Sequence, residues 1–299
     1  MTIAILSLVV GLLAVQRGPT TAVSGARISE LVQAMLTGND AQEARAIAEA
    51  RGIFKSRGLP TIGEVGDEAA YSFIVLICTG ERDVRASVLS KAKEAARRGQ
   101  LPSDAVRYCE ARIRLDDAIV QARGRAPTRP QLRDEIQRLF AADQAVRRQA
   151  DFDFEKMMQV DREHAPIVSA IFERYGLPTY SMVGPEAASN FVTLVQHQSP
   201  ELRHRVLPQL KAAVEAGHAD PTQYANLYDR SQRDAGRVQL YGQNLECSPQ
   251  SPTLHRAPIE DEANVNVRRA TIGLVRLELY ERVVIDTTSL TCGSAAQGK

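Results

Sequence analysis

The chain has 299 residues, of which 44% are hydrophobic and 24% are charged, ordinary values for a soluble globular protein of about two domains. Its 37 basic residues nearly balance its 36 acidic residues, which leaves a formal net charge of +1. Proteins that bind nucleic acids or membrane surfaces normally carry a strong basic excess, so the composition argues against both kinds of partner.

The N-terminus carries a run of about 13 almost entirely apolar residues, Ile3–Val15. Such a run is too short to span a bilayer comfortably, but it has the length of a signal-peptide core. We therefore expect residues 1–18 to be a signal peptide and the mature protein to be periplasmic or secreted. No Lys or Arg precedes the run, and Ala14 is the nearest small residue for cleavage. An uncleaved N-terminal membrane anchor therefore stays open, and no later segment is apolar enough to span a membrane.

Two stretches of the chain repeat each other at an offset of 118 residues. Ile53–Thr61 reads IFKSRGLPT, and Ile171–Thr179 reads IFERYGLPT. The match continues at the same offset from Val65–Ala70 to Val183–Ala188. A similarity this long at a constant offset predicts an internal duplication.

The duplication divides the chain into a degenerate first copy, residues 26–122, and a second copy, residues 130–285, followed by a flexible tail, residues 286–299. Apolar residues recur at helical spacing in both copies, and Ser199-Pro200 is a typical helix start. We therefore predict a mostly α fold in which two tandem, degenerate copies of a helical unit pack together.

Strand-like sequence is scarce. Only two compact runs are β-prone, Tyr71–Ile77 and Arg282–Asp286, and the first reads equally well as a buried helix.

The four cysteines are Cys78, Cys109, Cys247 and Cys292. An even number in an exported chain permits disulfides, and a bridge between Cys247 and Cys292 could hold the C-terminus. Cys78 lies in an apolar run, where a free buried thiol is the commoner outcome. No Cys or His spacing is typical of a zinc site, so we expect no metal, and nothing in the sequence predicts a cofactor.

The second copy contains polar residues that the first copy lacks. In the alignment of the copies, His197 replaces Thr79, Asp229 replaces Glu110, and Arg230 replaces Ala111. Residues 236–244 and 265–280 have no counterpart in the first copy. Any site is therefore expected in the second copy.

Several short motifs occur together in the second copy. They are Asp143-Gln144-Ala145-Val146-Arg147, Val183-Gly184, Gln196-His197, Asp229-Arg230, Gln239-Leu240-Tyr241-Gly242, and Arg268-Arg269 with Gly273-Leu274. In this combination, residues 130–282 resemble an uncharacterised bacterial domain family of unknown function. The sequence departs from the family pattern at Gln198-Ser199 and Gln243-Asn244. The resemblance implies a helical domain with a shared polar site, and it implies no particular reaction.

His197 and Asp229 are the candidate catalytic residues. His197 is expected at the C-terminus of a helix, where the helix dipole favours the imidazolium and permits acid–base chemistry. The alternative is a histidine that only caps the helix. Asp229 could orient His197, as a carboxylate does in hydrolytic triads, or could form a salt bridge between helices.

The candidate ligand-binding residues are Arg230, Gln239, Tyr241, Asn244, Arg268 and Arg269. The neutral polar groups beside Gly242 suit recognition of sugar, peptide or amide groups, and suit a structural loop equally well. Arg268 and Arg269 could clamp a carboxylate or phosphate, or could pair with Asp229 or Asp261.

Two hypotheses follow. In the first, a pocket in the second copy binds a small polar or anionic ligand in the cell envelope and, in the stronger form, hydrolyses it. His197 would be the acid or base, Asp229 its orienter, and Arg269 the anion clamp. In the second, the protein is a non-catalytic interaction module that binds a protein partner, and the polar cluster is structural.

Overall fold

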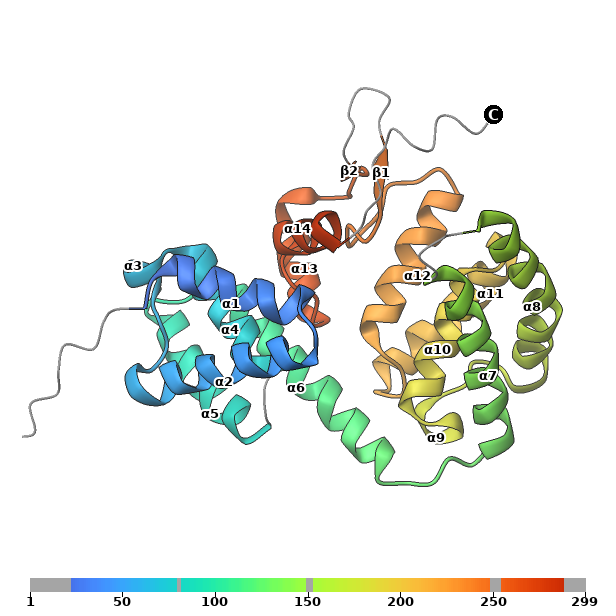
Figure 1. Ribbon diagram of the computed structural model, residues 1–299, viewed down its shortest axis with the longest axis horizontal. Helices are drawn as coiled ribbons and strands as arrows, with labels where there is room; N and C mark the ends of the chain where they lie inside the picture. Colours follow the sequence, from blue (N-terminus) through green and yellow to red (C-terminus); the bar gives the residue numbers. More distant parts are fainter. Residues whose placement is uncertain (1–22, 80–81, 149–152, 248–253, 288–299) are drawn as a thin grey trace, which may run out of the picture.

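The computed structural model describes residues 23–79, 82–148, 153–247 and 254–287, and it is mostly helical, as predicted (Figure 1). The predicted signal peptide, residues 1–18, lies outside the described residues. Across these ranges no helix combines the length and apolar character needed to cross a membrane.

The N-terminal part forms a first group of helices, coloured from blue to light green in Figure 1. These helices are α1 (Gly25–Thr37), α2 (Asp40–Arg57), α3 (Ile62–Val65), α4 (Asp67–Thr79), α5 (Arg82–Arg97) and α6 (Ser103–Arg123). Helix α4 is the centre of this group, because all its residues from Ala69 to Cys78 are buried. The remaining helices surround it, so an unbroken apolar run forms a buried helix here.

The middle of the chain forms a second group, coloured green to orange in Figure 1. Its helices are α7 (Pro130–Arg147), α8 (Phe154–Tyr175), α9 (Tyr180–Val183), α10 (Pro185–Gln196), α11 (Pro200–Glu215) and α12 (Pro221–Asp234). They enclose a separate apolar core that includes Ile136, Phe191 and Leu210. Helix α6 joins the two groups: Cys109 lies in the first core, whereas Ala118 packs against the second.

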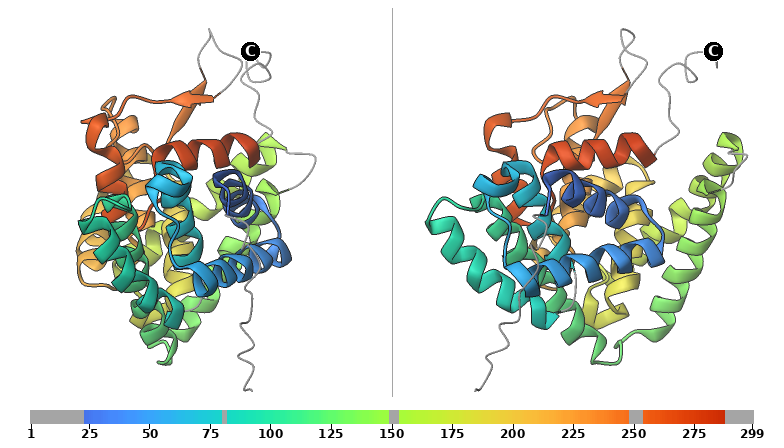
Figure 2. Two further views of the ribbon diagram at one scale, coloured as in Figure 1. Left: turned by 90° about the vertical axis from the view of Figure 1, so that its left-hand side faces the viewer. Right: turned by 60° about the vertical axis from the view of Figure 1, so that its left-hand side comes forward.

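The C-terminal part returns to the first group. It consists of β1 (Leu245–Cys247), β2 (Leu254–Arg256), the 3₁₀ helix η1 (Glu262–Asn264), α13 (Val265–Thr271) and α14 (Leu277–Thr287). The two strands pair antiparallel, and α14 lies along α1 (Figure 2).

The apolar residues of this C-terminal part enter the first core rather than the second. Ala270 and Leu279 are buried in the first core. Arg276 pairs with Asp104, with Nε 2.6 Å from Oδ2, and its backbone N–H donates to the Tyr71 hydroxyl at 2.8 Å. Residues 130–285 therefore do not pack as one separate unit, because their last two helices complete the core of the other group.

The two groups share an element order at the predicted offset of 118. Helices α3 and α9 both have four residues, and α5 and α11 both have sixteen. The glycines that end α3 and α9, Gly66 and Gly184, adopt the same left-handed conformation, with φ of 86° and 83°. This φ is unfavourable for residues with a side chain, so glycine is required at both corners.

Two expectations about local structure are wrong. Tyr71–Ile77 lies in α4, and Arg282–Asp286 lies in α14, so neither run is a strand. In α4 the helix overrides β-propensity because its apolar side chains are buried in the first core, whereas from α14 Leu279 enters that core and Ile285 is 45% exposed. The end of α14 also extends into the predicted flexible tail, as far as Thr287; residues 288–299 lie outside the described part.

The cysteine prediction also requires correction. Cys78 is not a free thiol: it forms a disulfide with Cys109 that links α4 to α6. Two helices buried against each other brought these cysteines together, which the sequence spacing of 31 residues did not indicate. Cys247 is also disulfide-bonded, and Cys292, its expected partner, lies outside the described residues.

Candidate functional site

His197 lies where the sequence predicted it, at the C-cap of α10 and three residues before the start of α11. The side chain of Ser199 caps α11, and Pro200 occupies the first turn, so the chain turns sharply at His197. The imidazole is mostly buried, with Nδ1 2.8 Å from Oδ1 of Asp143. Asp143, rather than Asp229, is therefore the carboxylate that orients His197.

Asp143 is on α7, and its side chain is 1% exposed. It also accepts hydrogen bonds from Arg147 Nε at 3.1 Å and Gln144 Nε2 at 2.8 Å. Burial alone would raise the pKa of Asp143, but the hydrogen bonds from His197 and Arg147 prevail and hold it at about 2. An ionised Asp143 can only accept, so the proton of the shared hydrogen bond is on Nδ1 of His197.

The Nε2 atom of His197 is chemically available. Within the described ranges no hydrogen bond is formed by this nitrogen. With Nδ1 protonated, Nε2 carries a lone pair in neutral imidazole and a proton in imidazolium. The same geometry thus serves a base, an acid or a nucleophile.

Asp161, on α8, adds a second carboxylate beside His197. Asp143, Asp161 and His197 each offer one atom within 4.8 Å of the others, a spacing suited to a metal ion. The Arg147 guanidinium, however, pairs with both carboxylates and so occupies the position of a cation. A metal ion would have to displace this guanidinium.

Arg203 stabilises the turn at His197 through hydrogen bonds to its backbone. Its guanidinium donates to the carbonyl oxygens of Gln196, at 3.2 Å, and Gln198, the residues on either side of His197. Its Nη2 lies 2.6 Å from Oδ2 of Asp234 on α12. Arg203 is 5% exposed, so this ion pair and these hydrogen bonds fix the backbone at His197.

Arg230, on α12, lies near this group without an ion-pair or hydrogen-bond partner in the described part of the chain. Desolvation lowers the pKa of Arg230, the positive charges of Arg203, Arg233 and Arg147 lower it further, and the negative charge of Asp234 opposes them. Arg203 contacts the backbone beside His197, and Arg147 contacts Asp143. On α12, Arg230 shares a helix face with Gln223, which accepts a hydrogen bond from Gln196, and with Asp234, which pairs with Arg203. Arg230 is therefore on the side of α12 that faces the His197 corner.

The other predicted residues form a second, separate cluster. Asp229 is 0% exposed, and its carboxylate accepts backbone N–H groups from Leu240 at 2.7 Å, Tyr241 at 3.1 Å and Gln243 at 2.9 Å. Burial raises the pKa of Asp229, and these three N–H groups oppose the rise. The carboxylate holds the loop after α12 in place and does not contact His197.

Arg269 is not an exposed anion clamp, contrary to the prediction. Its side chain is 0% exposed and donates to the carbonyl oxygens of Val275 at 2.6 Å and Tyr241 at 2.5 Å. The guanidinium also lies over the Tyr280 ring, 4.9 Å from its centroid. Burial lowers the pKa of Arg269 to about 10.

Arg268 also binds protein groups rather than presenting a free guanidinium. It donates to Leu240 O at 3.1 Å and pairs with Asp261 at 3.3 Å, which is the structural alternative considered above.

The loop residues Gln239 and Asn244 form hydrogen bonds with each other. The Gln239 side chain donates to the carbonyl of Asn244 at 2.9 Å and accepts its backbone N–H at 2.9 Å. A Cβ on Gly242 would lie 2.8 Å from both Ile259 and Leu277, so the close approach at this glycine is to protein. These neutral polar residues stabilise a loop, the structural alternative for this segment.

Tyr241 is half-buried in an aromatic cluster. Its ring makes edge contacts with Tyr224 and Tyr228 of α12, at centroid distances of 6.5 and 6.2 Å. Burial raises the pKa of Tyr241 to about 12, so the hydroxyl is neutral at physiological pH.

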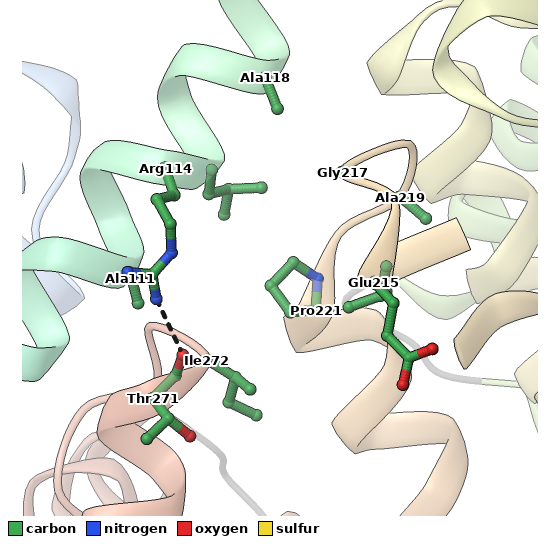
Figure 3. Close-up of a pocket in the computed structure, with 11 residues that line it drawn as sticks. Ala111, Arg114, Ala118, Glu215, Gly217, Ala219, Pro221, Thr271 and Ile272 are labelled. Atoms are coloured by element: carbon green, nitrogen blue, oxygen red, sulfur yellow. Dashed lines mark hydrogen bonds between the residues drawn. The ribbon is translucent and has the colours of Figure 1, made fainter. Parts of the chain in front are cut away.

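One cavity lies away from both clusters, between α6, the turn before α12 and the end of α13 (Figure 3). Its volume is about 260 Å³, and its lining includes Ala111, Leu115, Pro221 and Ile272. Figure 3 shows Arg114 beside this cavity, donating to Thr271 O. None of the eight predicted site residues lines this cavity or the other four cavities described.

The predicted site residues therefore lie in two separate clusters and not in a single pocket. His197 and Arg230 lie in one, and the other six residues lie in or beside the other. Sequence reasoning did not assign Asp143, Arg147 and Asp161 to the site. The Asp143-Gln-x-x-Arg147 motif was a usable signal, because residues four apart lie on one face of a helix. Asp161 had no such signal.

The comparison with protein families agrees with the position of these motifs. A family model described as "Family of unknown function (DUF6624)" matches residues 130–292, more than half of the chain. No curated protein and no solved structure matches. The chain therefore belongs to the DUF6624 family.

Proposed function

We propose that this member of the DUF6624 family binds a small anionic ligand between His197 and Arg230, and that His197 exchanges a proton with the ligand. One observation carries the proposal: Asp143 fixes Nδ1 of His197 at 2.8 Å and leaves Nε2 without a partner among the described residues, in which Arg230 also has no ion-pair partner. Oriented imidazoles of this kind act as acids and bases in hydrolytic sites.

A free guanidinium favours an anion. The three carboxylates of Asp143, Asp161 and Asp234 equal in number the three arginines of this group, but Arg147 and Arg203 form the ion pairs, and Arg230 has no ion-pair partner among the described residues. An incoming anion would pair with Arg230 and accept a hydrogen bond from the His197 imidazolium. The ionised Asp143 would stabilise that imidazolium.

The proposal includes the duplication. The matched lengths of α5 and α11 and the matched φ of Gly66 and Gly184 support a common origin of the two helical groups. In this account the second copy kept the site and the first became a scaffold. Thr79, at the position of His197, has no imidazole and cannot perform its chemistry.

The proposal also places the protein in the cell envelope, either periplasmic or secreted, with an uncleaved N-terminal anchor as the alternative. The Cys78–Cys109 disulfide supports export, because such bonds persist mainly in oxidising compartments.

The competing candidate is a non-catalytic module that binds a protein partner. The burial of Asp229 and Arg269 favours a structural role for that cluster, but it does not extend to Arg230, which remains partly exposed.

Calorimetric titration with inorganic phosphate, sulfate and acetate tests the proposal. We expect saturable binding of at least one anion by the full chain, weakened roughly tenfold or more in Arg230→Gln, which corresponds to loss of one charge-assisted contact. Arg233→Gln is the matched control, because Arg233 is on the same helix and faces Glu246 at 4.0 Å. Equal affinity in all three proteins would contradict the proposal.

A further inference from the structure

We infer that the anionic group bound at this site is a phosphoryl group, and that Nε2 of His197 attacks its phosphorus to form a phosphohistidine. This inference rests on the anion binding of the proposed function, specifies its ligand class, and assigns His197 nucleophilic attack in place of proton exchange. The inference depends on which side chains near the His197 corner have an electron pair that no hydrogen bond or ion pair occupies.

Few nucleophiles are present around His197. The Ser199 hydroxyl caps α11 by accepting the Leu202 N–H at 3.4 Å, so its oxygen is directed to the backbone. The carboxylates of Asp143 and Asp161 both pair with Arg147. Neither α10 nor α11 contains a cysteine. The Ser231 hydroxyl, next to Arg230 on α12, also has no hydrogen-bond partner within the described ranges, but Ser231 is 1% exposed and therefore closed to a ligand. Among the described residues around His197, Nε2 of His197 is the accessible nucleophile.

The orientation of the imidazole suits attack through Nε2. Asp143 accepts the Nδ1 proton at 2.8 Å, which selects the neutral tautomer whose lone pair is on Nε2. The Asp143 side chain is 1% exposed, and its carboxylate accepts hydrogen bonds from Gln144, Arg147 and His197. It therefore holds the ring in one orientation. When Nε2 forms a bond and the ring becomes cationic, the same carboxylate stabilises the positive charge.

The cation beside the nucleophile suits phosphorus better than a carbonyl carbon. A guanidinium matches two phosphate oxygens with its planar pair of donors, and positive charge is the main requirement for phosphoryl transfer. Acyl transfer instead needs N–H donors directed at one developing oxyanion. At the turn beside His197, the backbone N–H groups of His197 and Gln198 donate to the carbonyls of Leu194 and Val195 and are therefore occupied.

The Nε2 lone pair forms a bond to the phosphorus of a phosphate monoester, and the bond from phosphorus to the ester oxygen breaks. The alcohol leaves with that electron pair and takes a proton from water. In the second step water attacks the phosphorus, the N–P bond breaks, and inorganic phosphate is released as Nε2 regains its lone pair. No oxidant or reductant is needed.

The test uses the full chain with p-nitrophenyl phosphate, whose leaving group is coloured. We expect release of p-nitrophenolate and a phosphorylated chain after a rapid quench. The adduct should be stable in base and labile in acid, give a phosphoramidate signal in ³¹P NMR, and map to His197. His197→Gln should abolish the adduct, Arg230→Gln should slow its formation by about a hundredfold, and Arg233→Gln should leave it unchanged.

Binding of inorganic phosphate to the same variants separates two kinds of failure. Arg230-dependent phosphate binding without a phosphoramidate would overturn this inference and leave the proposed function intact. Absence of both phosphate binding and adduct would overturn this inference, and sulfate and acetate would then test the proposed function alone. An adduct that persists in His197→Gln would place the nucleophile elsewhere and would also overturn it.

Discussion

The two helical groups build the same corner around an arginine and differ in what that corner presents. In the first group Arg85 donates to the carbonyl of Thr79 at 2.9 Å and pairs with Asp116. In the second group, 118 residues later, Arg203 donates to the carbonyls on either side of His197 and pairs with Asp234.

This comparison separates the interactions that both groups share from those that occur in one group alone. The arginine, its acidic partner and the capped carbonyls occur in both groups, so they belong to the fold. The His197–Asp143 pair and Arg230 occur in the second group alone. The first group has Thr79 at the position of His197 and Ala111 at the position of Arg230. The specific residues therefore define the candidate site better than the general abundance of polar residues does.

The largest difference in stability loss is expected between the substitutions Asp229→Ala and Glu110→Ala, at aligned positions of the two groups. Asp229→Ala removes a fully buried carboxylate and leaves three backbone N–H groups and Arg269 without it, so unfolding free energy should fall by about 3–5 kcal/mol. Glu110→Ala removes a partly exposed ion pair with Lys93 and should cost less than about 1 kcal/mol. Urea unfolding measures both values. Equal losses would show that the loop does not depend on Asp229.

The Cys78–Cys109 disulfide should stabilise only the first group, because α7 to α12 contain no cysteine. Replacing both cysteines by Ala should lower the unfolding free energy by about 2–4 kcal/mol. Hydrogen exchange should speed up in α4 and α6 and stay unchanged at the His197 corner. Loosening of α10 to the same degree would mean that the two groups are one cooperative unit.

Arg85 and Arg203 should be equivalent for stability and unequal for function. Each arginine is largely buried and holds a carbonyl and a carboxylate, so Arg85→Gln and Arg203→Gln should each cost about 2 kcal/mol. Only Arg203→Gln should weaken phosphate binding, because only this arginine positions His197. The comparison requires thermal unfolding and calorimetry on both variants. Similar loss of phosphate affinity in both would remove the distinction between scaffold and site.

The pH dependence of stability should reveal Asp143. Its folded pKa of about 2 lies below the unfolded value of 3.8, so the ionised group stabilises the fold above about pH 4. The contribution of about 2 kcal/mol should be lost as the pH falls from 3.8 toward 2, with roughly half gone by pH 3.

The stability gap between the parent and Asp143→Asn should therefore narrow at acidic pH. Asp134→Asn, at an exposed position on the same helix, is the control and should show no such narrowing. A gap that stays constant between pH 6 and pH 3 would mean that Asp143 does not hold a depressed pKa.

Local features of the fold were predictable because they depend on nearby residues. The helical class and the position of His197 between α10 and the cap at Ser199 followed from apolar periodicity and capping residues. The buried run in α4 was ambiguous because a helix buried on all sides has no polar face to set the period.

Long-range pairings were not predictable from one sequence. The Cys78–Cys109 disulfide and the return of α13 and α14 to the first core depend on tertiary packing. The same holds for the site: the Asp143–His197 contact joins residues 54 apart in sequence. Asp229 seemed the natural partner for His197 because both differ from the residues aligned with them in the first helical group, yet the Asp229 carboxylate binds the loop after α12 instead.

The most direct test is an NMR titration of the His197 ring nitrogens with inorganic phosphate. The account predicts that Nε2 of His197 shifts saturably in the parent protein, that Arg230→Gln largely removes the shift, and that the side-chain signals of Gln239 and Asn244 stay fixed. A phosphate response centred on Gln239 and Asn244, or a His197 response that is unaffected by Arg230→Gln, would contradict the division of the polar residues into a site and a scaffold.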